Sequence, residues 1–174
     1  MDELGRATPD TFRGQAKMPI VVVLDNVRSA LNVGSAFRTA DAFALEKIYL
    51  CGITATPPHR EILKTALGST ETVVWEYAQD AVDVVNSLKR DGYETWAIEQ
   101  VEGSVRLQDF DFQEGIKIAV VFGNEVSGVE ESVIAACDGS LEIPQFGTKH
   151  SLNVAVCLGI VSWELVRKLK FPLI

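Results

Sequence analysis

The amino-acid sequence predicts an α/β domain with a mainly parallel β-sheet and helices on both of its faces. The first observation behind this prediction is the segment 19–24, PIVVVL, a continuous apolar run that is typical of a strand buried on both faces. The second is that strand-like segments alternate with helix-like segments along the chain. Together they indicate one sheet whose strands are connected through helices.

The elements of the first part of the chain follow from turn residues and apolar patterns. A turn is expected at 26–29 after the first strand, and a helix is expected over 30–44. A second strand is expected over 47–51. Two prolines open a short helix over 57–67, and Gly68 is suited to the position that follows its last turn.

The elements of the remaining part are expected in the same alternation. Asp80 is suited to cap a helix over 81–91, and Gly92 is suited to end it. The other strands are expected at 71–75, 93–98, 116–122 and 140–143, and the other helices at 129–136 and 151–168. We therefore expect one domain over 19–174, preceded by an N-terminal arm over 1–18.

The composition is that of a globular, cytoplasmic protein. The chain has 174 residues, of which 47% are hydrophobic, so a disordered chain is excluded. Its apolar runs are shorter than the roughly 18 residues that suggest a membrane span. The N-terminus is acidic and polar, unlike a signal peptide. We therefore expect no membrane segment.

Cysteine content and net charge exclude further classes of protein. Cys51, Cys137 and Cys157 lie in apolar surroundings without metal-ligand spacing, so we expect reduced, buried thiols and no metal site. The formal net charge of −8 excludes a protein that coats nucleic acid non-specifically, because phosphate binding needs clustered Lys and Arg. A local basic patch on an acidic body remains compatible with this charge.

Ligands of parallel sheets bind at the carboxyl ends of the strands, so the loops after Leu24, Ile98, Phe122 and Ile143 are candidate binding loops. The loop after Phe122 reads GNEVSG and contains Glu125 between two glycines, which allow close approach of backbone to a ligand. It has neither the GxGxxG pattern nor the Lys-Ser/Thr of a P-loop. A plain strand–turn–helix connection is the alternative.

The segment 143–160, IPQFGTKHSLNVAVCLGI, carries several polar residues just before an apolar helix. Ser151 and Asn153 lie near the expected helix start, where they would either hold a ligand or only cap the helix. A serine hydrolase is disfavoured, because Ser151 is not in a GxSxG motif and neither His59 nor His150 has an evident triad partner.

A third group of polar residues lies on the helix expected over 30–44. Asn32, Ser35 and Arg38 are three residues apart and therefore share one face of that helix. The alternative interpretation of Arg38 is a surface arginine that extends over apolar neighbours or pairs with an acid.

The three segments NVGSAFRTADAF, VFGNEVSGV and IPQFGTKHSLNVAV occur in this order. In this respect the chain resembles the SPOUT superfamily of S-adenosylmethionine-dependent RNA methyltransferases, in its SpoU/TrmH-like branch. The three segments are similar to motifs 1, 2 and 3 of that branch, and the resemblance extends over about 19–169. It is specific for the family and much less so for the substrate.

The resemblance implies a domain whose C-terminal part is threaded into a deep trefoil knot, although knots are rare exceptions among protein topologies. It implies that the knot's loops bind S-adenosylmethionine and that the helix 151–168 helps to form a homodimer. The implied reaction is methyl transfer to a ribose 2′-hydroxyl of tRNA or rRNA, which needs no metal.

The resemblance also assigns residues by motif position. The implied catalytic residues are Asn32, Arg38, Glu125, Ser151 and Asn153. The implied cofactor-binding residues are Glu99, Gly123, Ile143 and Leu152, of which Glu99 lies in a loop that no motif aligns. The resemblance gives Arg38 the role of proton acceptor, but a guanidinium stays protonated at neutral pH, so stabilisation of the developing alkoxide is the alternative role.

The sequence is also compatible with two rival functions and with a basic surface. A non-catalytic RNA-binding or assembly protein with the same fold is one rival, and the complete set of motif residues argues against it. A generic nucleotide-binding enzyme is the other, but the first turn, DNVRSALNVG, lacks the glycine fingerprint. A basic patch is hypothesised from residues of the arm and of the catalytic edge: Arg6, Arg13, Lys17, Arg28, Arg38, Arg60, Lys64 and Lys149.

Overall fold

The computed structural model describes residues 9–113, 115–148 and 151–170, and within them it contains one seven-stranded sheet with parallel pairing throughout. The strand order across the sheet is β3-β2-β1-β6-β4-β7-β5. The strands are β1 (Met18–Asp25), β2 (Leu45–Cys51), β3 (Trp75–Ala78), β4 (Tyr93–Ile98), β5 (Val105–Arg106), β6 (Lys117–Phe122) and β7 (Gly139–Glu142). The predicted α/β fold with a parallel sheet is confirmed.

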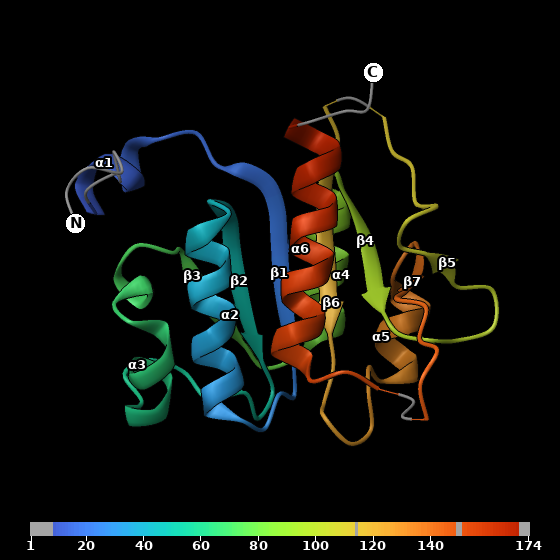
Figure 1. Ribbon diagram of the computed structural model, residues 1–174, viewed down its shortest axis with the longest axis horizontal. Coiled ribbons are helices and arrows are strands. Elements are labelled where there is room, and N and C mark those ends of the chain that lie inside the picture. The colour runs from blue at the N-terminus through green and yellow to red at the C-terminus, as the bar shows by residue number, and fades with distance from the viewer. Residues whose placement is uncertain (1–8, 114, 149–150, 171–174) are drawn as a thin grey trace.

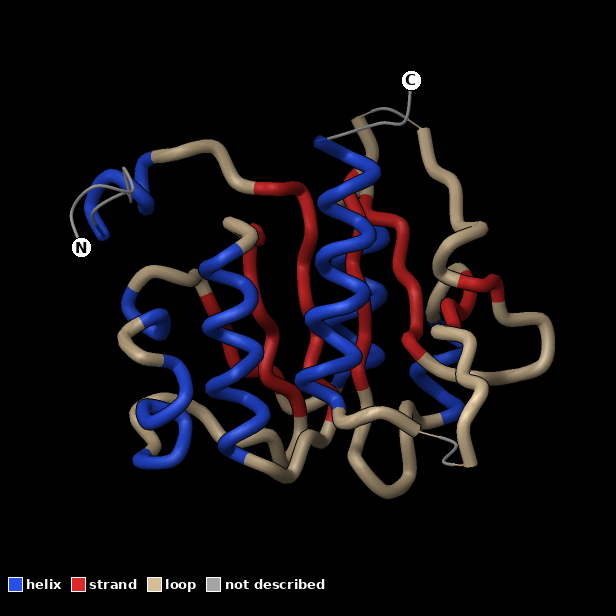
Figure 2. The backbone as a smooth tube through the Cα atoms, viewed as in Figure 1, coloured by secondary structure: helices blue, strands red, loops and turns tan. Residues whose placement is uncertain are grey.

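Helices cover both faces of the sheet, as predicted (Figure 1). Helices α2, α3 and α6 lie on the face turned to the viewer, and α4 and α5 lie behind the sheet. The helices are α1 (Pro9–Gly14), α2 (Ala30–Ala42), α3 (Arg60–Ala66), α4 (Ala81–Arg90), α5 (Glu131–Ala136) and α6 (Val154–Lys170). The loops that follow the strands gather at one edge of the sheet, at the bottom of Figure 2.

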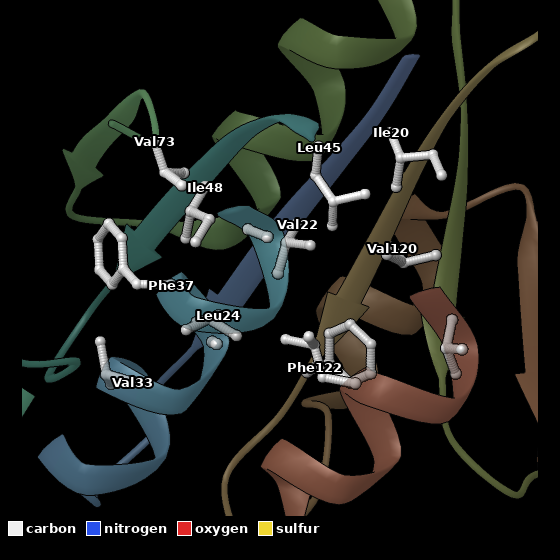
Figure 3. Close-up of a cluster of buried hydrophobic side chains, with 14 of the residues drawn as sticks. Ile20, Val22, Leu24, Val33, Phe37, Leu45, Ile48, Val73, Val120 and Phe122 are labelled. Atoms are coloured by element: carbon white, nitrogen blue, oxygen red, sulfur yellow. The ribbon is translucent and has the colours of Figure 1, made fainter. Parts of the chain in front are cut away.

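The central strand β1 explains why both faces need cover. Its residues alternate between two apolar cores: Ile20, Val22 and Leu24 belong to one, and Val21 and Val23 to the other. Figure 3 shows the first core, in which side chains of β1, β2 and β6 meet α2 and α6. All five side chains are at most 1% exposed, which confirms the strand buried on both faces that the apolar run predicts.

The structure differs from the sequence prediction after α3. The strand expected over 71–75 is wrong: a 3₁₀ turn occupies Ser69–Glu71, and β3 begins at Trp75. Hydroxyl side chains close this turn, because Ser69 Oγ donates to the Ala66 carbonyl at 2.7 Å and Thr72 Oγ1 donates to the Ser69 carbonyl at 3.2 Å. Such local bonds compete with strand pairing. The two-residue strand β5 carries no sequence signal that predicts it.

Two helix starts also differ from those expected. The helix expected over 57–67 begins at Arg60, because His59 Nδ1 accepts a hydrogen bond from the Glu61 N–H and caps the helix there. The helix expected from residue 151 begins at Val154. Both shifts place polar residues before the first turn of the helix rather than inside it.

Helices α2 and α3 pack unusually close together at Gly34. A Cβ at this position would lie 2.1 Å from Thr65 Oγ1 and 2.3 Å from the Ile62 carbonyl oxygen, both far below van der Waals contact. The Thr65 hydroxyl donates to the Leu31 carbonyl at 2.9 Å. The glycine inside α2 therefore fixes α3 against it.

The C-terminal segment returns from β7 along the loop edge to α6, which lies beside α2 (Figure 1). The trefoil knot implied by the resemblance concerns the threading of this segment and stays a prediction. Of the N-terminal arm, Arg6 lies outside the described residues. Lys17 Nζ contacts the Phe12 carbonyl at 2.5 Å and lies over the Phe12 ring.

Candidate active site

A cavity of about 440 Å³ opens at the carboxyl edge of the sheet, between the loops after β4, β6 and β7 and the start of α6. Three of the four loops expected to carry a ligand therefore meet around one space. The predicted cofactor-binding residues Glu99, Gly123, Ile143 and Leu152 all line it, and so do the predicted catalytic residues Glu125, Ser151 and Asn153. Asn32 and Arg38 do not belong to its lining.

The loop after β6 forms a tight hairpin over one side of the cavity. Asn124 and Gly128 exchange two backbone hydrogen bonds of 3.0 and 2.9 Å, and Asn124 Oδ1 accepts from the N–H groups of Val126 and Ser127. A Cβ at Gly123 would lie 2.2 to 2.3 Å from backbone atoms of Gly128 and Val129. Only glycine at position 123 allows the two ends of the hairpin to come together.

Glu99 holds this hairpin against β4. Its Oε2 accepts a hydrogen bond from the Val129 N–H at 3.0 Å, and its Oε1 accepts from the Gln100 N–H at 3.1 Å. The sequence places Glu99 in the cavity only through the resemblance. The structure shows that its carboxylate is tied to the backbone on both sides while it lines the cavity.

Glu125 joins the hairpin to the start of α2. Its Oε2 accepts from the Arg28 N–H at 2.9 Å, and its Oε1 accepts from the Ser29 N–H and from Asn32 Nδ2, both at 3.0 Å. Burial raises the pKa of Glu125, but the hydrogen bonds from Arg28, Asn32 and Ser29 outweigh it and lower the pKa overall. The carboxylate is therefore ionised and engaged with the N-terminus of α2, where negative charge is favoured.

Asn32 connects Glu125 to Asn153. Asn153 Nδ2 donates to Asn32 Oδ1 at 3.2 Å, while Asn153 Oδ1 accepts from the Ala155 N–H at 2.9 Å and caps α6. Asn153 therefore caps α6 and also lines the cavity, and its role toward a ligand stays a prediction. Residues of all three sequence motifs form one hydrogen-bonded chain, Glu125–Asn32–Asn153, along the edge of the cavity.

Ser151 and Arg38 have different surroundings. Ser151 is exposed at the lip of the cavity. His59 caps α3 and does not line the cavity, and Lys149 and His150 lie outside the described residues. Arg38 is exposed on α2, about 9 Å along the helix axis from Asn32. Within the part of the chain that the structure describes, its side chain has no hydrogen-bond or ion-pair partner.

Two further residues of the cavity are not identified by the sequence. Asn124 positions the hairpin and donates from Nδ2 to the Asn26 carbonyl at 2.8 Å. Cys157 lines the cavity four residues after Asn153, on the same side of α6. Burial, with the charge of Glu99, raises the pKa of the Cys157 thiol to about 12, so the thiol is neutral. Its helical spacing from Asn153 is the signal that would have indicated it.

Asp25 ends β1 on the other side of the same edge. It is 3% exposed, its Oδ1 accepts from Asn26 Nδ2 at 2.9 Å, and its Oδ2 has no hydrogen-bond partner among the described residues. Burial, and then the charges of Glu130 and Asp80, raise the pKa of Asp25 from 3.8 to about 6. At neutral pH this carboxylate is ionised at a cost to the folded state.

Asp25→Asn is expected to change how stability depends on pH. Between pH 3.8 and about 6 the folded protein keeps a proton that the unfolded chain has lost, so this site makes wild-type stability fall as pH rises. The free energy of unfolding of Asp25→Asn, minus that of the wild type, should rise by roughly 1 to 3 kcal/mol across this window. Urea unfolding at several pH values measures it.

Asp138→Asn provides the matched control for this measurement. Burial raises the pKa of Asp138, but Lys89 and Thr95 outweigh it and lower the pKa overall. The stability that Asp138 contributes is present above its unfolded pKa and is lost as pH falls. The free energy of unfolding of Asp138→Asn, minus that of the wild type, should therefore fall as pH rises, opposite to the change expected for Asp25→Asn. An Asp25→Asn difference that does not change with pH would contradict the prediction.

The described residues hold neither a membrane-spanning helix nor a cluster of metal ligands. None of the helices within 9–113, 115–148 and 151–170 has both the length and the apolar character needed to cross a membrane. The described residues also contain no group of three or more His, Cys, Asp and Glu side chains arranged to hold a metal ion.

Comparison with known proteins identifies a family. The sequence model of the SpoU rRNA Methylase family matches residues 19–163. A 23S rRNA (guanosine-2′-O-)-methyltransferase of Vibrio cholerae is 27% identical over 159 residues, which are 91% of this chain and 63% of that protein. A tRNA (guanosine(18)-2′-O)-methyltransferase of Thermus thermophilus is 29% identical over 86% of this chain and 75% of that protein. The chain thus spans less than two thirds of the length of the Vibrio protein.

Solved structures agree with these relatives. The A. aeolicus TrmH/SpoU tRNA modifying enzyme superposes with a TM-score of 0.81 at 25% identity, covering 92% of this chain and 81% of that one. An AdoMet-bound rRNA methyltransferase from Sinorhizobium meliloti superposes with a TM-score of 0.81 at 29% identity, covering 94% of this chain and 62% of that one.

Proposed function

This chain belongs to the SpoU rRNA Methylase family, and from this membership we propose that it transfers a methyl group from S-adenosylmethionine to a ribose 2′-hydroxyl of tRNA or rRNA. The observation that carries the proposal is the chain Glu125–Asn32–Asn153, which brings residues of three separate motifs to the edge of one cavity. The names of the relatives, which act on guanosine 2′-hydroxyls of tRNA and of rRNA, support the same reaction.

The cavity fits the cofactor. Its volume of about 440 Å³ lies within the range of about 300–1,000 Å³ that small-molecule sites occupy. Gly123 keeps backbone close to the cavity, Ile143 and Leu152 supply apolar surface, and Glu99 and Glu142 supply negative charge beside it. These groups would hold a cofactor with an apolar ring system and a positive sulfonium. When bound, S-adenosylmethionine supplies a methyl group that is already activated for transfer.

The residues of this chain have to position the 2′-hydroxyl and accommodate its charge. A ribose hydroxyl is a poor nucleophile, so its orientation and the stabilisation of developing negative charge are the main requirements. Glu125 is a weak base, because hydrogen bonds from the N–H groups of Arg28 and Ser29 and from the Asn32 side chain lower its pKa. We assign to Glu125, Asn32 and Asn153 the positioning of the site, to Ser151 orientation of the hydroxyl, and to Arg38 stabilisation of the developing alkoxide.

A homodimer is part of the proposal. Leu152 and α6 present four large apolar side chains to solvent, which we call the α6 face: Leu152, Val156, Ile160 and Trp163, between 39% and 52% exposed. A continuous apolar surface of this kind marks an interaction site. The other side of α6 is buried in the core through Leu158, Val161 and Leu165. A second copy of this chain is the occupant that the family and the twofold symmetry of most dimers favour.

The dimer would also explain the position of Arg38. In one protomer Arg38 lies outside the cavity, on the exposed surface of α2 beside α6. Because α2 packs beside α6, pairing of two α6 faces would place the α2 helix of each protomer close to the interface. We therefore propose that each active site combines the cavity of one protomer with Arg38 of its partner.

A two-step experiment tests the proposed reaction. Isothermal titration with S-adenosylmethionine should show saturable binding, and incubation of the complex with unmodified tRNA or 23S rRNA transcripts should give 2′-O-methylated nucleosides detectable by mass spectrometry. Cofactor binding followed by methylation of the nucleobase instead of the ribose would contradict the reaction. Absence of cofactor binding would favour the non-catalytic RNA-binding protein.

A further inference from the structure

The cations of this acidic protein are unevenly distributed. Several Lys and Arg side chains have acidic partners, such as Lys89 with Asp138 and Arg167 with Glu164. Within the described residues, the side chains without a hydrogen-bond, ion-pair or ring partner are Arg28, Arg38, Arg60, Lys64, Arg90, Arg106 and Lys170. The first four of these belong to α2, to α3 and to the turn before α2, and we call them the α2–α3 basic face.

The packing of α3 on α2 places the helix that carries Arg60 and Lys64 beside the helix that carries Arg38. Gly34 lets the two helices approach closely, and Thr65 ties them together through the Leu31 carbonyl. Arg60 and Lys64 are one turn apart on α3, opposite the buried Ile62 and Ala66 of the same helix. All four cationic residues are exposed. The two helices lie side by side in Figure 1.

The turn that contains Arg28 is bonded to the wall of the cavity. The backbone N–H of Arg28 donates to Glu125 Oε2 at 2.9 Å, and Glu125 lines the cavity. From this turn the chain continues into α2, which carries Arg38, and α3 packs against α2. The basic face therefore belongs to elements that adjoin the cavity, and a polymer bound at the cavity has neighbouring residues that can extend over them.

Acidic residues on the two helices do not neutralise this face. Glu61 is the exposed acid of α3, and Asp41 of α2 accepts a hydrogen bond from the Thr72 hydroxyl. The chain as a whole carries a net charge of −8 and repels a polyanion. RNA can therefore be held only where positive charge is locally in excess, and the α2–α3 basic face is such a place.

We propose that the α2–α3 basic face binds the sugar–phosphate backbone of the substrate RNA next to the nucleotide that is methylated. The inference rests on the proposed function for the identity of the polymer. Arg60 and Lys64 contact phosphates without reading the base sequence, and they contribute affinity and orientation rather than chemistry. Arg38 also belongs to this face, but we assign it to methyl transfer, so the phosphate contacts are proposed for Arg60 and Lys64.

The double variant Arg60→Ala/Lys64→Ala tests the inference, with Arg90→Ala/Arg106→Ala as its charge-matched control. Fluorescence anisotropy with an unmodified, labelled tRNA transcript gives Kd between about 50 and 200 mM salt. Loss of two phosphate contacts should lower the slope of log Kd against log salt by about 1.4 to 1.8, and Kd at the lowest salt should rise about tenfold. The control variant should bind RNA like the wild type.

Further measurements separate this role from a structural one and from the proposed reaction. The double variant should keep its melting temperature and its affinity for S-adenosylmethionine, and its kcat at saturating RNA should stay within about twofold while KM rises. An unchanged salt slope, or an equal loss of RNA affinity in the control, would overturn the inference. RNA binding is measured without turnover, so a protein that binds RNA through this face but methylates nothing would contradict only the proposed function.

Discussion

Arg38→Ala is expected to abolish detectable methyl transfer, a loss of at least about 1,000-fold in kcat, because we assign to Arg38 the stabilisation of the developing alkoxide. Arg38 is exposed on α2 and does not line the cavity of its own protomer. The affinity for S-adenosylmethionine should therefore stay close to that of the wild type. Single-turnover methylation measures the first quantity, and isothermal titration measures the second.

Two controls accompany this variant. Arg90→Ala removes an exposed, unpartnered arginine from the end of α4 and should leave turnover unchanged. Arg38→Lys keeps the charge but loses the planar array of donors, so it should recover only part of the activity. Wild-type turnover in a folded Arg38→Ala variant would refute the assignment of Arg38 to the reaction.

Gly123→Ala is expected to lower the affinity for S-adenosylmethionine by at least about 100-fold. The added methyl group would displace the backbone of the hairpin, and restoring the hairpin for binding would cost several kcal/mol of binding free energy. A methyl group at position 123 would lie 2.2 to 2.3 Å from backbone atoms of Gly128 and Val129, which cannot move without opening the hairpin that lines the cavity. Isothermal titration gives the affinity, and circular dichroism reports whether the domain stays folded.

Gly14→Ala is the matched control for this substitution. A Cβ at Gly14 would meet no atom within 4 Å, so its variant should bind the cofactor like the wild type. If Gly123→Ala folds and binds S-adenosylmethionine with wild-type affinity, the hairpin does not shape the cofactor site.

Mixing the two inactive variants tests the composite site. In a heterodimer of Arg38→Ala and Gly123→Ala, an arginine that acts across the interface leaves one site intact, whereas an arginine that acts in its own protomer leaves none. Random reassociation should then restore about a quarter of wild-type activity, because half of the twofold dimers are heterodimers with one intact site. Dimers with no restored activity would place Arg38 in the same protomer as the cavity.

The sequence predicts the parallel sheet well because its central strand leaves few alternatives. The run 19–24 has no polar residue that would mark a solvent-facing side, so it must be covered on both faces. The error at β3 has the opposite cause: residues 71–75 are suited to a strand, but the hydroxyls of Ser69 and Thr72 donate to nearby backbone carbonyls and stabilise a turn, which Thr72 also bonds to Asp41 of α2. Local bonds of this kind depend on α2 and α3, which a strand pattern does not describe.

The sequence predicts which residues belong to the candidate site, but it does not predict the contacts between them. The three motifs indicate that Asn32, Glu125 and Asn153 belong together, and the structure joins them by hydrogen bonds. The sequence does not indicate that Glu125 is occupied by the N-terminus of α2, because its partners Arg28 and Ser29 offer backbone groups that any residue would supply. Nor does the sequence indicate that Arg38 lies outside the cavity. The spacing along a helix shows which residues share one face, but it does not show which part of the protein that face contacts.

The order of strands in the sheet has a consequence for synthesis of the protein on the ribosome. Ile20 of β1 pairs with Ile118 of β6, so one edge of β1 stays unpaired until nearly a hundred further residues have been made. Until β6 has been synthesised, the part of the sheet made of β1, β2 and β3 therefore exposes an unpaired apolar edge. The cavity closes later still, with the segment that precedes α6. The cofactor therefore binds only after this segment has been made and has folded, and it cannot assist the folding of shorter nascent chains.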